Sequence, residues 1–211
     1  NSGLANKTFF IGDSNIQQYY PRVDELIKNS PNATNSVIFS TLGCSPIPHV
    51  VGVNRAHCFD LLENSLELIK SDKDITTVVL GAFWPNYLSD VAGFYYEEQG
   101  QNFPMATGNT GYQKALASLS NYIQALKKNN VRIVLILNSP FGAELDPKYM
   151  VKRSMITFPD VLKIRDGGIS VKKLDETYGV IKSDLARIAL ANQIEIIDPL
   201  LYMCNSDTCP S

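Results

Sequence analysis

The chain has 211 residues, 45% of them hydrophobic and 19% charged, which is typical of one globular domain and excludes a disordered chain. Its 19 basic and 21 acidic residues give a formal net charge of −2, so nothing attracts it electrostatically to nucleic acid or to an anionic membrane surface. No run approaches the roughly 18 consecutive apolar residues of a membrane-spanning helix. The polar start, without an initiator methionine, indicates a processed product or an excised domain.

Five apolar segments of strand length recur along the chain, with helical patterns between them. Strands are predicted at residues 8–12, 36–41, 76–83, 131–137 and 194–198. Helices are predicted at residues 24–28, 59–70, 111–128 and 174–191, mostly from apolar residues three or four positions apart. All strands except the second are almost continuously apolar, which is typical of parallel strands covered on both faces. The pattern therefore predicts an α/β fold with a five-stranded, mostly parallel sheet and right-handed crossovers.

Two stretches, residues 87–109 and 138–171, break this alternation. Each is rich in glycine and polar residues and follows a predicted strand. Each is therefore expected at the carboxyl edge of the sheet, where open α/β sheets bind their ligands. The alternative is two ordinary surface insertions. We favour substrate-facing loops, because both leave the sheet at the same edge as the polar residues that follow the first strand.

The first strand ends at Gly12 and is followed by three small polar residues, Asp13, Ser14 and Asn15. One interpretation is an ordinary strand–turn–helix, in which Asp13 or Ser14 caps the helix. The other is that Ser14 is a nucleophile. A serine hydroxyl needs a base to take its proton and donors to receive the oxyanion, and the backbone N–H of Ser14 is a candidate donor.

The ends of the second and third strands carry further candidate donors. Gly43 follows the second strand, and a glycine there allows a backbone N–H to turn toward the site without a side chain in the way. Trp84 and Asn86 follow the third strand, and the side-chain amide of Asn86 is a donor. The alternatives are a half-buried packing role for Trp84 and a turn role for Asn86.

The four cysteines, Cys44, Cys58, Cys204 and Cys209, form two clusters that are each short in sequence. An even number in close pairs favours two local disulfides, Cys44–Cys58 and Cys204–Cys209, and an oxidising compartment. Four reduced thiols and a zinc site are the alternatives. The C-x4-C spacing is loose for zinc, and the two histidines of the chain are not spaced as zinc ligands.

Several short motifs together resemble the SGNH (GDSL-like) hydrolase family. They are "FIGDSN" followed by Pro21, "GCSP" with a second cysteine downstream, "LGAFW", and "IIDPLLYMCNSDTC" near the end. More narrowly, they are similar to the periplasmic SGNH domain fused to membrane acyltransferase-3 proteins, which O-acetylate bacterial surface polysaccharides such as lipopolysaccharide O-antigen. The resemblance spans the five strands. It implies a single SGNH-like domain over residues 1–211, built as a three-layer α/β/α, flavodoxin-like sandwich.

The resemblance also assigns roles to residues of this chain. It makes Ser14 the nucleophile and Gly43 an oxyanion donor. The third family block usually carries an asparagine after a glycine. Here the stretch is Gly81-Ala82-Phe83-Trp84, which resembles the tryptophan-containing, acyltransferase-linked branch. Trp84 and Asn86 are therefore expected to stabilise the site, and Asp13 to be a structural hydrogen-bonding residue.

The general base departs from the family pattern. The family's Asp-x-x-His block lies C-terminal to the last cysteine pair, where this sequence ends with Cys209-Pro210-Ser211. We expect this domain to be excised from a larger membrane protein and to lack that block. The less favoured alternatives are His49 or His57 as the base, or an inactive relic that serves in binding.

The resemblance implies an O-acyltransferase that moves an acyl group, acetyl above all, to a hydroxyl of a bacterial surface polysaccharide or lipid-linked glycan. The expected location is the periplasmic side of a bacterial inner membrane. The expected partner is an N-terminal membrane acyltransferase-3 domain of the same polypeptide, which would supply the acyl donor, and no nucleic acid. No metal or other cofactor is implied. The alternatives are a carbohydrate O-acetyl esterase and a catalytically incomplete glycan-binding module.

Overall fold

A computed structural model describes residues 6–30, 34–52, 58, 60–146, 151–152, 160–161 and 168–210. Its main sheet has five strands in the order β11-β7-β4-β1-β2, and all four neighbouring pairs are parallel. The strands are β1 (Lys7–Gly12), β2 (Asn35–Ser40), β4 (Ile75–Gly81), β7 (Arg132–Ile136) and β11 (Glu195–Ile197). They correspond to the five predicted strands, so the predicted α/β class with a five-stranded parallel sheet is confirmed.

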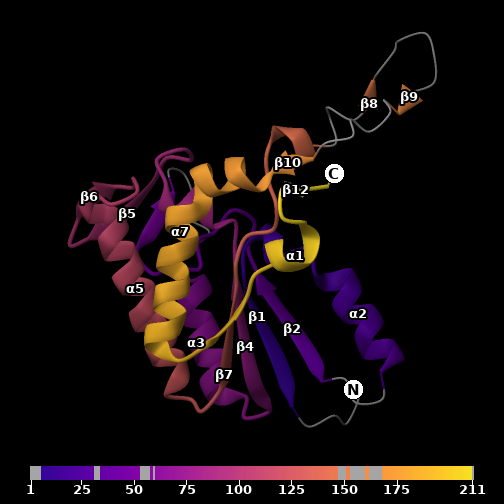
Figure 1. Ribbon diagram of the computed structural model, residues 1–211. Coiled ribbons are helices and arrows are strands. Elements are labelled where there is room, and N and C mark those ends of the chain that lie inside the picture. The colour runs from indigo at the N-terminus through magenta and orange to yellow at the C-terminus, as the bar shows by residue number, and fades with distance from the viewer. Residues whose placement is uncertain are drawn as a thin grey trace.

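Helices lie on both sides of this sheet, as expected of a three-layer α/β/α sandwich. Helices α3 (Leu61–Ser71), α5 (Thr110–Lys127) and α7 (Val171–Asn192) gather on one side, and α2 (Tyr20–Asn29) lies on the other (Figure 1). Neighbouring side chains of β4 lie on opposite faces of the sheet. Leu80 belongs to the large core under α5 and α7, whereas Val79 belongs to a smaller cluster with Ile16 of α1 (Ser14–Gln17).

The two longest helices begin where a polar side chain caps their first turn. The side chain of Asn109 accepts a hydrogen bond from the backbone N–H of Tyr112 at 2.9 Å, and α5 begins at Thr110, the residue after Asn109. The hydroxyl of Ser170 accepts a hydrogen bond from the N–H of Lys173 at 3.2 Å, and α7 begins at Val171, the residue after Ser170. The helix predicted at 174–191 therefore starts three residues too late, because the apolar pattern alone misses the polar first turn.

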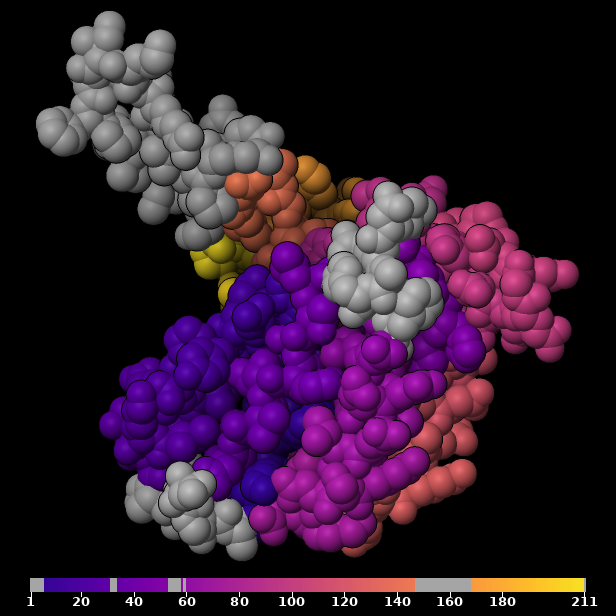
Figure 2. Space-filling view, turned by 180° about the vertical axis from the view of Figure 1, so that it is seen from behind, coloured from indigo at the N-terminus to yellow at the C-terminus, as the bar shows by residue number. Residues whose placement is uncertain are grey.

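A second sheet is a feature that the sequence pattern did not predict. Strands β3 (Val50–Gly52), β5 (Phe94–Glu98) and β6 (Gln101–Pro104) form an antiparallel sheet. Strands β5 and β6 lie in the predicted loop stretch 87–109, and β3 lies between the strand predicted at 36–41 and the helix predicted at 59–70. The hairpin closes at Gln99 and Gly100, which both have positive φ (51° and 77°), as a two-residue type I′ turn requires. The hairpin projects from the side of the molecule (Figure 2).

The remaining elements lie between β4 and the end of the chain. They are α4 (Trp84–Leu88), η2 (Ala143–Leu145), β8 (Val151–Lys152), β9 (Asp160–Val161), β10 (Ile169–Ser170), α8 (Leu200–Met203) and β12 (Thr208–Cys209). Strands β10 and β12 pair antiparallel, as do β8 and β9. No helix in the described ranges is long and apolar enough to span a membrane.

Both predicted disulfides are present. Cys44 and Cys58 are joined with their Cα atoms 5.3 Å apart, and Cys204 and Cys209 with theirs 4.0 Å apart. The four thiols are thereby used, which rules out the alternatives of reduced cysteines and of a cysteine zinc site. The first disulfide ties down the loop after β2, and the second closes the turn between α8 and β12.

Candidate active site at the carboxyl edge of the sheet

The register of the sheet brings the predicted site residues to one edge. Gly12, at the end of β1, pairs with Ser40 of β2 and with Gly81 of β4, and Gly81 pairs with Ile136 of β7. The segments that follow these strands therefore leave the sheet side by side. The backbones approach closely here, because a Cβ added at Gly12 would lie 1.9 Å from the carbonyl oxygen of Gly81.

Ser14 is the first residue of α1 and is partly exposed. The next two N–H groups of the helix are occupied: that of Asn15 donates to Asp13 Oδ1 at 2.8 Å, and that of Ile16 to the Asp13 carbonyl at 3.1 Å. Within the described part of the chain, neither the hydroxyl nor the backbone N–H of Ser14 has a hydrogen-bond partner. A hydroxyl and an N–H from one residue are thus both available to a ligand at a helix N-terminus, a position that favours negative charge.

Asp13 is a buried carboxylate that ties the end of β1 to the segment after β4. It is 2% exposed. Besides capping α1, its Oδ2 accepts hydrogen bonds from the backbone N–H of Phe83 at 3.0 Å and from the hydroxyl of Tyr87 at 2.9 Å. Three donors satisfy the carboxylate, as a buried charged group requires. The structural hydrogen-bonding role predicted for Asp13 agrees with these contacts.

Gly43 lies in the short loop after β2 and has a φ of 65°, a conformation that glycine adopts without strain. The loop is held to the end of β1, because the N–H of Thr41 donates to the carbonyl of Gly12 at 3.2 Å. Cys44, the next residue, is fully buried and disulfide-bonded to Cys58. The loop is therefore anchored on both sides of Gly43, at the same edge of the sheet as Ser14.

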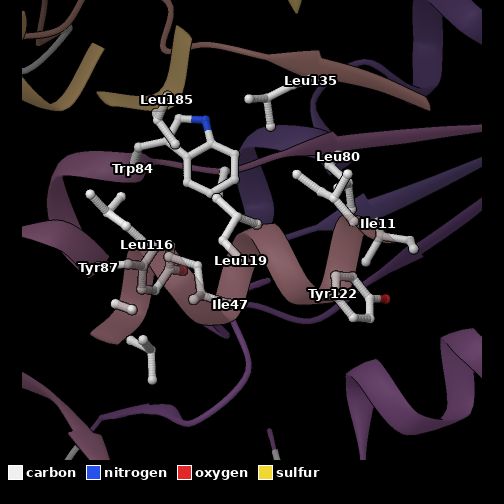
Figure 3. Close-up of a cluster of buried hydrophobic side chains, with 14 of the residues drawn as sticks. Ile11, Ile47, Leu80, Trp84, Tyr87, Leu116, Leu119, Tyr122, Leu135 and Leu185 are labelled. Carbon is white, nitrogen blue, oxygen red and sulfur yellow. The ribbon is translucent and has the colours of Figure 1, made fainter. Parts of the chain in front are cut away.

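Trp84 lies in the core rather than facing a ligand. It is 0% exposed, and its indole N–H donates to the carbonyl of Ile136 at 2.8 Å. Figure 3 shows the indole among the apolar side chains Leu119, Leu135 and Leu185. The one hydrogen-bond donor of this side chain is already used. These contacts therefore do not support the expectation that Trp84 stabilises the site directly, and they support the alternative of a packing role. Asn86, two residues on, is partly exposed and remains the candidate donor of this block.

Asn138 is a site-edge residue that the sequence analysis did not single out. It is 3% exposed and follows β7. Its Oδ1 accepts the backbone N–H of Trp84 at 2.9 Å, and its own N–H donates to the hydroxyl of Tyr178 on α7 at 3.1 Å. Burial raises the pKa of Tyr178, so this hydroxyl stays protonated at neutral pH. The only available signal was a polar residue directly after the apolar run that ends the fourth predicted strand.

No contact of the described residues places His49 beside Ser14. His49 is exposed, and its ring lies against that of Tyr96 on β5 with the ring centres 5.6 Å apart. It lines two hollows of about 320 and 460 Å³, and Ser14 lines neither. His57 lies outside the described residues.

The described parts of the two predicted substrate-facing stretches begin at the carboxyl side of the main sheet (Figure 1). The stretch 87–109 contains β5 and β6 and is anchored next to the site, because the ring of Tyr87 packs edge-to-face on that of Phe94 with the ring centres 4.7 Å apart. The stretch 138–171 begins beside it, where Phe141 packs edge-to-face on Phe83 at 5.0 Å. Their contact with an acceptor stays a prediction.

The edge thus combines an unengaged serine at a helix N-terminus, an anchored glycine loop and an asparagine. Among solved structures, the chain is similar to the periplasmic domain of a lipopolysaccharide acetyltransferase from Salmonella ser. Paratyphi A, with a TM-score of 0.56 and 17% identity over 100% of this chain and 72% of that one. It is also similar to TesA, with a TM-score of 0.51 and 11% identity over 94% of this chain and 81% of that one. At these identities the two structures establish the fold alone.

A comparison of the sequence with curated proteins found no match. A family model described as "SGNH domain (fused to AT3 domains)" matches residues 2–211. This match covers almost the whole chain and includes the strand ends that carry Ser14, Gly43 and Asn86. The chain therefore belongs to the family of SGNH domains that are fused to AT3 domains.

Proposed function

We propose that this domain transfers an acyl group, most simply acetyl, to a hydroxyl of a bacterial surface polysaccharide such as lipopolysaccharide O-antigen, with Ser14 as the nucleophile. The observation that carries the proposal is the state of Ser14. Its hydroxyl and its N–H are both without partners among the described residues, at the start of a helix whose next N–H groups are occupied. One residue thus offers both an attacking oxygen and an oxyanion donor.

The chemistry would proceed in two acyl-transfer steps. The Ser14 oxygen attacks the carbonyl carbon of the donor ester while a base takes its proton, and the N–H groups of Ser14 and Gly43 and the Asn86 amide receive the negative charge on the carbonyl oxygen. The donor's leaving group departs with a proton, and an acyl-serine ester remains. A sugar hydroxyl then attacks this ester and gives up its proton, so that the acylated sugar leaves and the serine hydroxyl is restored.

The setting of this reaction follows from the family. The family model describes SGNH domains fused to AT3 domains, which indicates a membrane acyltransferase domain in the same polypeptide. We propose that this domain supplies the acyl group and that the present domain works in the periplasm, on a polysaccharide or lipid-linked glycan. No organic cofactor or metal is needed for the two steps.

The general base is a separate proposal, because no described residue hydrogen-bonds the Ser14 hydroxyl. We propose that it is the histidine of an Asp-x-x-His block in polypeptide that continues past Ser211. A base at the nucleophile contributes about 10²–10⁴-fold in rate. The oxyanion donors act independently of it, so residues 1–211 alone are expected to retain weak Ser14-dependent turnover of an activated ester.

An O-acetyl esterase is the second candidate, because the same acyl-serine ester can be attacked by water. The fold similarity to TesA is compatible with either acceptor. The two reactions differ in their products: a transferase gives an acetylated oligosaccharide, and an esterase gives free acetate. A glycan-binding module without catalysis is the third candidate, and it predicts no Ser14-dependent turnover at all.

The test is hydrolysis of p-nitrophenyl acetate by residues 1–211 and by a longer chain that continues past Ser211, each with Ser14→Ala. Ser71→Ala is the matched control, because Ser71 is exposed at the end of α3 and, among the described residues, its hydroxyl bonds the carbonyl of Leu68 alone. We expect Ser14→Ala alone to abolish turnover, and the longer chain to be about 10²–10⁴-fold faster.

Other outcomes point elsewhere. If the short chain matches the longer one and His49→Ala or His57→Ala removes the activity, the base lies within these 211 residues. If Ser14→Ala changes nothing in either chain, the serine mechanism is wrong and the binding module takes its place.

A further inference from the structure

We propose that Asp13 is a positioning residue, whose single carboxylate fixes the helix that carries Ser14 against the helix that carries Asn86. The proposal rests on the proposed function, because it concerns the geometry of the same site. Asp13 itself is too deeply buried to touch a substrate.

The two helices are too short to hold an orientation of their own. Helix α1 has four residues and α4 has five. An isolated helix becomes marginally stable in water only at roughly 12–15 residues. The orientation of α1 and α4 is therefore set by tertiary contacts, among them whatever satisfies the N–H groups of their first turns.

One side chain accepts an N–H group at the start of each helix. Asp13 Oδ1 accepts the N–H of Asn15 in the first turn of α1, and Oδ2 accepts the N–H of Phe83, the residue that precedes α4. The side chain of Phe83 cannot cap its own helix, so α4 depends on side chains from other strand ends, Asp13 after β1 and Asn138 after β7. Oδ2 also accepts the hydroxyl of Tyr87 from the other end of α4, which fixes the direction of that helix.

Burial makes these three hydrogen bonds hard to replace. Asp13 is 2% exposed and Tyr87 is 0% exposed, so water cannot easily take the place of either partner. A buried donor that loses its acceptor carries its full desolvation cost, and the chain relieves this cost by moving. The movable parts here are the short helices α1 and α4.

The consequence for catalysis lies in the distance between two oxyanion donors. The N–H of Ser14 is at the start of α1, and the amide of Asn86 is inside α4. They stabilise the same oxyanion only if the two helices keep their relative position. A misplacement of about 1 Å costs on the order of 10²-fold in rate, and loss of one oxyanion donor costs about 10²–10³-fold.

The decisive variant is Asp13→Asn in the full-length polypeptide. Asparagine keeps the shape but replaces one oxygen with an NH₂ group, which faces the N–H of either Asn15 or Phe83 as a second donor. One of the two helices is thereby released. Tyr87→Phe is the milder variant, because it leaves both backbone hydrogen bonds of Asp13 in place. Tyr122→Phe is the matched control: it removes a buried tyrosine hydroxyl that bonds Ser65 at 2.6 Å, outside the site.

We expect Asp13→Asn to lower kcat for p-nitrophenyl acetate about 10²-fold, with KM changed less than about twofold. Tyr87→Phe and Tyr122→Phe should lower kcat by less than about threefold, although all three variants lower Tm. A merely structural role predicts instead that, at a temperature where every variant is folded, Asp13→Asn keeps kcat within about threefold of Tyr122→Phe. That result would overturn the proposal.

Hydrogen–deuterium exchange tests the positioning without relying on turnover. In Asp13→Asn, the amides of α1 or of α4 should exchange faster, whereas in Tyr122→Phe they should not. If the wild-type protein shows no Ser14-dependent turnover, the proposed function fails, and the exchange result still decides the positioning. Unchanged exchange in both helices of Asp13→Asn would refute it.

Discussion

The substitutions Gly81→Ala and Gly12→Ala are expected to disturb the site in different ways. Only the clash made by Gly81→Ala should be relieved by a second substitution, Ile16→Val. A Cβ at Gly81 would lie 2.5 Å from Cδ1 and 3.1 Å from Cγ1 of Ile16, the outer atoms of a flexible side chain. A Cβ at Gly12 would lie 1.9 Å from the carbonyl oxygen of Gly81 and 2.6 Å from Ile16 Cγ1. The first of these atoms belongs to the paired backbone of β1 and β4 and cannot move without breaking the sheet.

The magnitudes follow from these contacts. Overpacking at Gly81→Ala should cost about 1–3 kcal/mol of unfolding free energy. Ile16→Val removes Cδ1 and should cost about 0.5–1.5 kcal/mol by itself. In the double variant the nearest clashing atom is gone, so its stability should be close to that of Ile16→Val, a favourable coupling of about 1 kcal/mol or more. Gly12→Ala should exceed the upper end of that range, about 3 kcal/mol, and Ile16→Val should not rescue it.

Urea unfolding of the wild-type protein and these variants measures the coupling, and p-nitrophenyl acetate turnover follows the site. Ile16 lies two residues after Ser14 on α1, so displacement of its side chain by Gly81→Ala should also lower kcat, and Ile16→Val should restore part of the loss. Strictly additive costs for Gly81→Ala and Ile16→Val would show that the clash is absent. Rescue of Gly12→Ala by Ile16→Val would show that the backbone contact is not the limiting one.

Two further predictions concern stability. Replacing Cys44 and Cys58 together by serine should lower the unfolding free energy by about 3 kcal/mol, because the disulfide closes a loop between two residues 14 positions apart. A cost below about 0.5 kcal/mol in urea unfolding would contradict this. Burial raises the pKa of Tyr122 from 10.0 to about 12, so between pH 10 and 12 the unfolded state loses a proton that the folded state keeps, and stability falls as pH rises. Tyr122→Phe should remove about 2 kcal/mol of that decline in unfolding experiments at pH 10 and 12, and an unchanged decline would refute the assignment.

Part of this fold could be predicted from sequence because its signals are local. Apolar runs, almost continuous in all but the second, indicated five parallel strands, and all five are present within two residues of the predicted bounds. The fifth, β11, was expected to be covered on both faces but is exposed, because it lies at the edge of the sheet. The short spacing of the cysteines indicated both disulfides for the same reason. The position of Ser14 at a strand end followed by a helix was also readable, since three consecutive small polar residues interrupt an apolar strand.

The antiparallel sheet was missed although its turn left a trace. The dipeptide Gln99-Gly100 suits the type I′ hairpin that it forms, yet β6 is too polar and exposed for an apolar pattern to mark it as a strand. Strand β3, which pairs with the other side of β5, comes from a different part of the chain and lies more than 40 residues before β5. A strand of this kind is defined by its pairing, and pairing between distant segments is decided by the assembled fold.

The sequence by itself determined the class of the fold, the positions of its five main strands along the chain and the residue proposed to carry the chemistry, because each depends on side-chain pattern within a short segment. The tertiary structure alone decided what surrounds that residue. It brings Phe83 and Tyr87, 70 and 74 residues away in sequence, into hydrogen bonds with Asp13. It also buries Trp84 with its indole N–H bonded to the carbonyl of Ile136, and it brings Asn138 to the same edge of the sheet. The physical reason is that a buried polar group takes its partners from whichever strand ends the sheet register sets beside it, and that register exists only once the sheet is assembled.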